Sequence, residues 1–321
     1  MKSHFAVVLA VIATCALPLR SHAQAVSPTP TEPCEAAYAS LPVGSVLDLL
    51  DPHAPGDRRA AALAAYERLA GIEACPEFAY TLGQLYRHGS YLPGNLVPQD
   101  IERARELILP MAEDGYLPAF ADLAEMEMRH ANARAAMQWT QVYLHFVQTV
   151  QADYVEDVDA LRFQRSAYNR HLLARTDFLW RRLTRPVLSR KLIAADLSAY
   201  LAAHEAAIAP RMRMRQEGAL RRASAQDGGP ARVTHVPDDC YVNAIRGVGS
   251  ASASWIVEVL PTGERGRMVL ENFVPNPAAA ARMEACLARY EFAPFVGTRP
   301  ATVRISMLLG SPEGGSLQRR R

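Results

Sequence analysis

The chain has 321 residues, of which 50% are hydrophobic and 21% charged, and its formal net charge at pH 7 is +2. This length allows two domains with cores of their own. The near-neutral charge points to no special class of partner, and we expect no nucleic-acid partner.

The first 25 residues have the layout of a secretory signal peptide. Lys2 gives a positive start, residues 5–17 are apolar, and Ala23 and Ala25 supply small residues for cleavage. The apolar stretch is shorter than the ~20 residues that a membrane-spanning helix needs. We therefore expect a periplasmic protein, with an uncleaved N-terminal anchor as the alternative. No later segment is predicted to span a membrane, although contact with a membrane surface stays open.

Four cysteines remain after the predicted cleavage: Cys34, Cys75, Cys240 and Cys286. An even number in an exported protein favours disulfides, and four cysteines allow three connectivities. One pair lies in each half of the chain, so we predict Cys34–Cys75 and Cys240–Cys286, each contributing about 4 kcal/mol by loop closure. No Cys-x-x-Cys motif and no zinc-type spacing is present, so we expect neither a metal nor a cofactor.

Composition divides the chain after the signal peptide into several segments. Residues 26–33 form a Pro/Thr-rich leader, 34–222 are helical in pattern, and 223–231 are a linker without apolar periodicity. From 232 to 309 the pattern changes to period two, and the Gly/Ser-rich tail 310–321 is expected to be disordered. The predicted fold class is therefore multi-domain: an all-α domain followed by a small α+β domain.

Weak internal repetition marks the helical part. The motif Leu-Gly-x-x-Tyr-x-x-Gly covers residues 82–89, Asp100 follows in a loop, and a degraded copy begins at Ala119. The pattern resembles the Sel1-like repeat, a relative of the tetratricopeptide repeat, which implies stacked helix pairs. Gly83 would let the two helices of a pair approach closely, and Gly115 lies where a helix must stop.

Basic residues gather in the second half of the helical part. We interpret them as a solvated basic face, and contact with anionic lipid heads or another acidic periplasmic partner is the second interpretation. These residues are Arg175, Arg181, Arg182, Arg185, Arg190, Lys191, Arg211, Arg213 and Arg215.

A β-hairpin is predicted at the start of the C-terminal part. Apolar residues alternate in segments 255–260 and 267–273, so that Trp255 and Val257 would share one face. The connection 261–266 is rich in turn-forming residues, as a hairpin requires.

A helix and a third strand are predicted to follow the hairpin. The helix would run from about Pro275 to Tyr290 and pack a stripe that includes Met283 and Cys286 on the sheet. After a Pro/Gly turn, residues 301–308 alternate apolar and polar side chains, which is typical of a strand.

This order of hairpin, helix and strand resembles the C-terminal domain of TonB-type energy transducers. In that family the helix exits through an aromatic-x-Phe-x-Pro motif, and Gly-x-x-Pro leads into the last strand. Tyr290, Phe292, Pro294, Gly297 and Pro300 occupy those positions here, and the resemblance covers roughly residues 232–309.

The resemblance implies a periplasmic domain that binds partners and does no chemistry of its own. It implies that a partner segment adds to an exposed strand edge, for which 301–308 is the candidate strand. The candidate partner-binding residues are Tyr290, Phe292, Pro294, Val303 and Ile305. A role in the core is the alternative, which we favour for Tyr290 and Phe292.

No catalytic motif is found in the sequence, because Gly-x-Ser-x-Gly, His-Glu-x-x-His and phosphate-binding loops are all missing. His130 with Glu125 and Glu127 comes nearest to a cluster, and we interpret these as solvent-facing helix residues. We therefore expect a non-catalytic adaptor or scaffold of the bacterial envelope that binds periplasmic or outer-membrane proteins. Two alternatives are a TonB-type energy transducer supporting outer-membrane transport and an envelope hydrolase with an unrecognised site.

Overall fold

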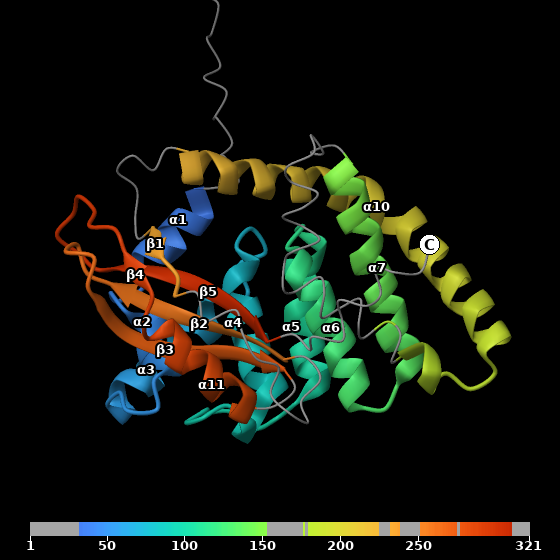
Figure 1. The fold of residues 1–321 in the computed structure, drawn as a ribbon, viewed down its shortest axis with the longest axis horizontal. Coiled ribbons are helices and arrows are strands. Elements are labelled where there is room, and N and C mark those ends of the chain that lie inside the picture. Colours follow the sequence, from blue (N-terminus) through green and yellow to red (C-terminus); the bar gives the residue numbers. More distant parts are fainter. Residues whose placement is uncertain are drawn as a thin grey trace, which may run out of the picture.

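The computed structural model describes residues 32–152, 176, 179–224, 232–237, 251–274 and 277–309. This part of the chain is mostly helical, with a small region of antiparallel strands near its C-terminal end (Figure 1). The expected order of a mostly helical part followed by a small region with strands is therefore confirmed. The predicted signal peptide 1–25, the tail 310–321 and Cys240 lie outside the described residues.

Helices come first along the described chain, and the strands follow α10, with α11 between β3 and β4. The helices are α1 (Glu32–Ala39), α2 (Ser45–Leu50), α3 (Gly56–Leu69), α4 (Pro76–His88), η1 (Gly89–Tyr91), α5 (Ile101–Glu113), α6 (Leu117–Arg129), α7 (Ala133–Ala152), α10 (Pro186–Ser224) and α11 (Pro277–Leu287). The strands are β1 (Val233–His235), β2 (Ala251–Val259), β3 (Arg265–Val274), β4 (Glu291–Phe292) and β5 (Ala301–Leu309).

Two predicted segment boundaries shift by a few residues. Helix α1 begins at Glu32, inside the predicted leader, because Pro33 fits the first turn, where its missing N–H is not needed. Helix α10 ends at Ser224, inside the predicted linker. The remaining linker residues, 225–231, lie outside the described part of the chain.

The helical part is built from antiparallel pairs, in which α4 packs on α5 and α6 packs on α7. A Cβ added at Gly83 would lie 2.6 Å from Cγ1 of Ile108, so this glycine allows α4 and α5 to approach closely, as predicted. Asp100 caps the N-terminus of α5 by accepting a hydrogen bond from the backbone N–H of Arg103 at 2.9 Å.

Helix α10 wraps around the outside of the helix pairs and crosses the top of the molecule (Figure 1). It packs mainly on α7 and also contacts α5. Its inner face buries Ile193, Ile208 and Met212. At Gly115, which has φ +85°, an added Cβ would lie 2.5 Å from the backbone nitrogen of Met212, so α10 sits directly on the α5–α6 turn.

Replacing Gly115 by alanine is expected to lower the free energy of unfolding by about 2–4 kcal/mol, because left-handed strain and a backbone clash add together. Thermal or urea unfolding measures the loss. The matched control is Gly71→Ala, since a Cβ there meets nothing within 4 Å and no positive φ is required. Equal stability of the two variants would show that α10 does not rest on Gly115.

The C-terminal sheet has the strand order β3–β2–β5, and both pairings are antiparallel. The predicted hairpin is present, with Gly263 at φ +86° in its turn. Trp255 and Val257 are buried, and the stripe with Met283 and Cys286 on α11 is buried as well. The predicted strands, their buried face and the helix are therefore present, but the helix ends at Leu287, three residues before the predicted Tyr290.

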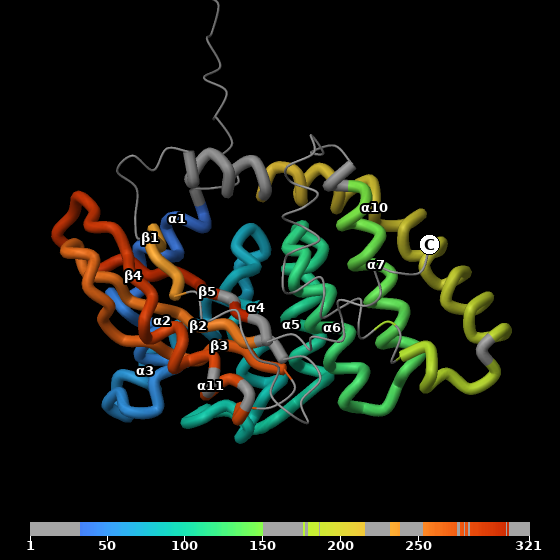
Figure 2. The backbone as a smooth tube through the Cα atoms, in the orientation of Figure 1, coloured from blue at the N-terminus to red at the C-terminus, as the bar shows by residue number. Residues whose placement is uncertain are grey.

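The sheet shares one hydrophobic core with the first helices. Helix α11 covers one face, and α2 and α4 contact the sheet as well, so that residues far apart in sequence lie side by side (Figure 2). The same buried cluster holds Leu47 and Leu85 of the helices together with Val257, Phe273 and Ile305 of the strands. The predicted linker therefore does not separate two independent cores.

By length and composition, the described part of the chain contains one helix that could cross a membrane, residues 187–215. Its most apolar window of 18 residues has a mean hydropathy of 1.2, and 17% of that window is buried inside the protein. This corrects the expectation that no later segment is apolar enough. Its two carboxylates nevertheless have partners within the protein: Asp196 pairs with Arg134 at 2.5 Å, and Glu205 with His145 at 2.7 Å. These contacts favour a helix that belongs to the packed helical part.

Candidate functional site

The outer edge of β5 is the candidate site for binding a partner. β5 pairs with β2 along its whole length, with Ala251 opposite Leu309 and Val259 opposite Ala301. Within the described residues, no backbone group of β5 bonds to any other strand or loop. In an antiparallel strand every second residue directs its N–H and C=O away from the neighbouring strand. The edge therefore offers a row of backbone donors and acceptors.

The side chains of β5 do little to block this edge. Natural edge strands are usually protected by lysine, proline or a bulge, but the sequence Ala-Thr-Val-Arg-Ile-Ser-Met-Leu-Leu contains neither residue, and its register with β2 is continuous. The single charge, Arg304, reaches across the sheet to β3, where Nε and Nη2 donate to the two carboxylate oxygens of Glu271, each at 2.6 Å. The edge is therefore long, regular and mostly apolar.

The five predicted partner-binding residues have different environments. Phe292, in β4, and Ile305, in β5, are buried in the shared core. Tyr290 and Val303 are partly buried and pack against that core. Only Pro294 is exposed. Their apolar character therefore serves folding more than contact, which is the alternative favoured above for Tyr290 and Phe292.

The segment after α11 lies at the end of the sheet where β5 begins. Phe295 donates its N–H to the carbonyl of Pro261 in the β2–β3 turn at 3.0 Å. Phe292 pairs with Val233 of β1, so the two-stranded sheet β1–β4 holds this segment in place. The next residues, 296–300, are all exposed, and Val296 is 93% exposed. These exposed residues lead directly into β5.

A buried polar network joins the helices to the sheet and was not predicted. The fully buried guanidinium of Arg87 lies 2.6 Å from Oδ1 of Asp122. Tyr80 and Gln84 donate to Oδ2 of the same carboxylate at 2.7 Å each. Asn272 on β3 accepts from Arg87 at 3.2 Å and donates to Asp122 at 3.2 Å. The network thereby fixes β3, and with it the sheet, on α4 and α6.

A signal for this network exists in the sequence of α4. Tyr80, Gln84 and Arg87 follow the i, i+4, i+7 spacing that puts side chains on one helix face. That face would normally be apolar where a helix is buried. The partner Asp122 is far away in sequence, so the spacing alone does not reveal the pairing.

His88 lies beside this network and is kept neutral. Burial, followed by the charges of Arg87 and Arg129, holds its pKa well below 6.5. Its Nε2 lies 2.9 Å from Oδ1 of Asn272, and its ring stacks on Phe273 with centroids 4.2 Å apart. Because Asn272 Oδ1 is an acceptor, Nε2 carries the proton of the neutral ring.

The lowered pKa of His88 predicts a loss of stability in mild acid. Below about pH 6.5 the unfolded chain takes up a proton at this residue and the folded protein does not, so the free energy of unfolding falls by about 1.4 kcal/mol per pH unit. Urea unfolding between about pH 7 and 5 measures this slope, above the range of ordinary carboxylates. His88→Gln should lose this part of the slope, and the exposed control His53→Gln should keep it. Equal slopes in both variants would contradict this assignment.

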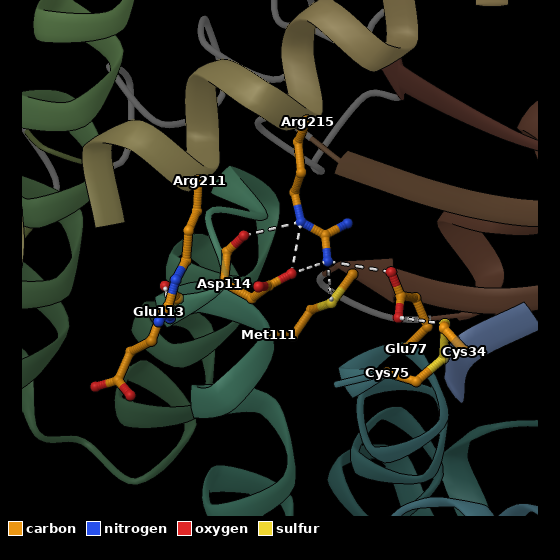
Figure 3. A network of polar contacts seen from close by, with 8 residues as sticks. All are labelled: Cys34, Cys75, Glu77, Met111, Glu113, Asp114, Arg211 and Arg215. Atoms are coloured by element: carbon orange, nitrogen blue, oxygen red, sulfur yellow. Dashed lines mark hydrogen bonds and ion pairs between the residues drawn. A yellow bond between two sulfur atoms is a disulfide. The ribbon is translucent and has the colours of Figure 1, made fainter. Parts of the chain in front are cut away.

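A second polar network fastens α10 to the first helices (Figure 3). Nε of Arg215 donates to the backbone carbonyl and to Oδ2 of Asp114, each at 2.9 Å, and its Nη2 donates to Glu77 at 3.1 Å. Glu77 lies beside the Cys34–Cys75 disulfide, which is present as predicted. One arginine thus connects the end of α5, the start of α4 and the disulfide that holds α1.

The structure describes one of the two cysteines of the second predicted disulfide. Cys286 is disulfide-bonded, whereas its predicted partner Cys240 lies outside the described residues. Among the described residues, Cys34, Cys75 and Glu77 form one group of potential metal-ligating atoms. With the two sulfurs bonded to each other, no thiolate is available as a ligand.

The cluster of His130, Glu125 and Glu127 needs a correction. Both glutamates are buried, and only His130 faces solvent. Glu127 accepts hydrogen bonds from Arg105 at 2.7 Å and from Asn132 at 3.0 Å, so it ties α6 to α5 and to the following turn. The position of Glu127 toward α5, rather than toward solvent, is set by the packing of the two helices.

Comparison of the chain with protein-family models, curated proteins and solved structures found no match.

Proposed function

We propose that this protein is a non-catalytic adaptor of the bacterial periplasm, which binds an extended segment of a partner protein along the outer edge of β5. The single observation that carries the proposal is the outer edge of β5, which no described strand or loop pairs with: nine residues in regular register, without proline or lysine. Addition of a strand to such an edge gives affinity through backbone hydrogen bonds, and alternate side-chain positions give specificity.

The periplasmic location rests on the N-terminal sequence and on the use of cysteine. The signal-peptide pattern of residues 1–25 predicts export, and a disulfide such as Cys34–Cys75 persists in an oxidising compartment. The adaptor role also fits the two resemblances found in the sequence. The helical part resembles Sel1-like or tetratricopeptide repeats, and the sheet region resembles the TonB C-terminal domain. Both kinds of domain are used for protein contacts.

The helical part would serve as a rigid base for the edge. The Arg87–Asp122–Asn272 network and the shared core hold the sheet on α4 and α6. Removing residues 232–309 would expose that core, so a truncated chain is a poor test of binding. Single substitutions within β5 are a cleaner test.

Neighbouring proline substitutions in β5 are expected to separate folding from binding. Of Thr302 and Val303, one directs its N–H toward β2 and the other directs it outward. The inward proline removes a ladder bond and destabilises the fold, whereas the outward proline keeps every ladder bond and should be as stable as the alanine variant of the same position. Only urea unfolding is needed to tell which variant is which.

The outward variant then tests the proposal. The wild-type protein and both variants are used to capture partners from envelope extract, and the captured proteins are compared by mass spectrometry. The outward proline should reduce capture of the specific partner at least about tenfold, because it removes a donor and obstructs the approaching strand. Undiminished capture by this stable variant would contradict binding at the β5 edge.

A further inference from the structure

The corner where the chain enters α10 carries exposed apolar side chains. Val187 is 72% exposed, Leu188 48% and Leu192 37%, within the first two turns of the helix. Leu188 and Leu192 are four residues apart and share the outer face with Lys191, which is also exposed. In Figure 1 this corner is at the lower right, where the yellow-green start of α10 meets the lower end of α7. It therefore projects from the helical part at the end remote from the sheet.

The same corner is surrounded by positive charge. Residues 179–195 contain Arg181, Arg182, Arg185, Arg190 and Lys191, all exposed, and contain no Asp or Glu. The adjoining helix α7 has no acidic residue either. The next carboxylate along α10, Asp196, is engaged by Arg134 at 2.5 Å. Arg185, Arg190 and Lys191 therefore give the described part of this corner a positive charge.

The corner is held firmly by a small core of its own. Leu179 and Ile193 are buried against Ala136 and Met137 of α7. Arg190 lies over the ring of Trp180, 5.2 Å from its centroid, and this contact orders the basic side chain near the surface. The exposed leucines are thus presented by a rigid element, so burying them against another surface costs little conformational entropy.

We propose that this corner binds the surface of an anionic phospholipid bilayer, with Leu188 and Leu192 inserted among the lipids and the basic residues at the headgroups. An exposed apolar stripe flanked by arginine and lysine matches the chemistry of interfacial helices. The positive charge of residues 179–195 complements an anionic surface. The helix lies on the membrane and does not span it, because Ile208 and Met212 farther along are buried in the protein. This site is distinct from the β5 edge.

Vesicle binding of the full-length mature protein tests the proposal. The probes are vesicles of phosphatidylethanolamine with phosphatidylglycerol and, for comparison, vesicles of phosphatidylcholine alone, with cosedimentation as the readout. We expect binding to the anionic vesicles only, and release at high salt, because screening removes the attraction between the surface charges. Arg185→Gln with Lys191→Gln should weaken the affinity about thirtyfold. Leu188→Ser with Leu192→Ser should weaken it about tenfold.

Matched controls and contrary outcomes make the test decisive. Val43→Ser removes another exposed apolar side chain, 69% exposed, and Arg103→Gln removes another exposed arginine, and both should bind vesicles like the wild type. Every variant should unfold like the wild type and still capture the β5 partner. The proposal is overturned if the wild type ignores anionic vesicles, if salt cannot release it, or if the corner variants bind equally well. If the wild type ignored the vesicles but bound an acidic polypeptide, and the corner variants lost that binding, the corner would be assigned to an acidic protein partner instead.

Discussion

Replacing Asp122 by alanine should lower the free energy of unfolding by about 3–5 kcal/mol, the largest effect expected of a single substitution in this protein. Its carboxylate pairs with Arg87, whose side chain is 0% exposed. Without Asp122 the guanidinium keeps a charge that burial makes costly, and Tyr80 and Gln84 lose their acceptor as well. Urea denaturation followed by circular dichroism measures the change.

The control for this experiment is an ion pair on the surface. Arg103 and Glu106 pair at 2.9 Å, with side chains 53% and 66% exposed. Glu106→Ala should therefore change the free energy of unfolding by less than about 1 kcal/mol. If Asp122→Ala cost no more than this control, the network would not be what holds the sheet on the helices.

Removing the Cys34–Cys75 disulfide should have the second largest effect. The bridge closes a segment with a sequence separation of 41, so the variant Cys34→Ala with Cys75→Ala should lose about 4 kcal/mol in the chain-entropy model. Helix α1 should also become sensitive to proteases, because it is short and Tyr38 of α1 contacts the body of the protein through Phe78. Urea unfolding and limited proteolysis measure the two effects.

A reductant provides the control for the disulfide. In its presence the wild type should approach the variant, since Cys34 and Cys75 are then unlinked in both proteins, and the disulfide of Cys286 is reduced in both. Any remaining difference in the free energy of unfolding then comes from the replacement of the two cysteine side chains by alanine. A difference that persists undiminished would mean that the packing of the buried Cys75, and not the bridge, supplies the stability.

Local patterns predicted the elements well where one face of an element determines its packing. Period two in β2, β3 and β5, the stripe on α11 and the close approach at Gly83 depend on residues near each other in sequence. The arrangement of these elements was less predictable. The sheet and the first helices share a core, which no composition change along the chain reveals, since Leu47 and Phe273 come together only on folding.

Side-chain roles were predicted less well than elements. Phe292 was a candidate for partner contact because of a motif, and Ile305 because it lies on the candidate edge strand, but both side chains are buried in the core. Arg87 and Asp122 carry no motif, and their burial depends on a partner 35 residues away and on Asn272, 185 residues from Arg87. A backbone edge has no side-chain signature of its own, so the candidate edge was inferred from the resemblance to the TonB C-terminal domain.

The most direct test of the account is hydrogen exchange of the β5 amides, measured residue by residue in the free protein and in complex with the captured partner. We predict that every second amide of β5 exchanges rapidly in the free protein while its neighbours are protected by β2, and that the partner slows the rapid set. Protection of all β5 amides in the free protein, or a rapid set that the bound partner leaves unchanged, would contradict strand addition at this edge.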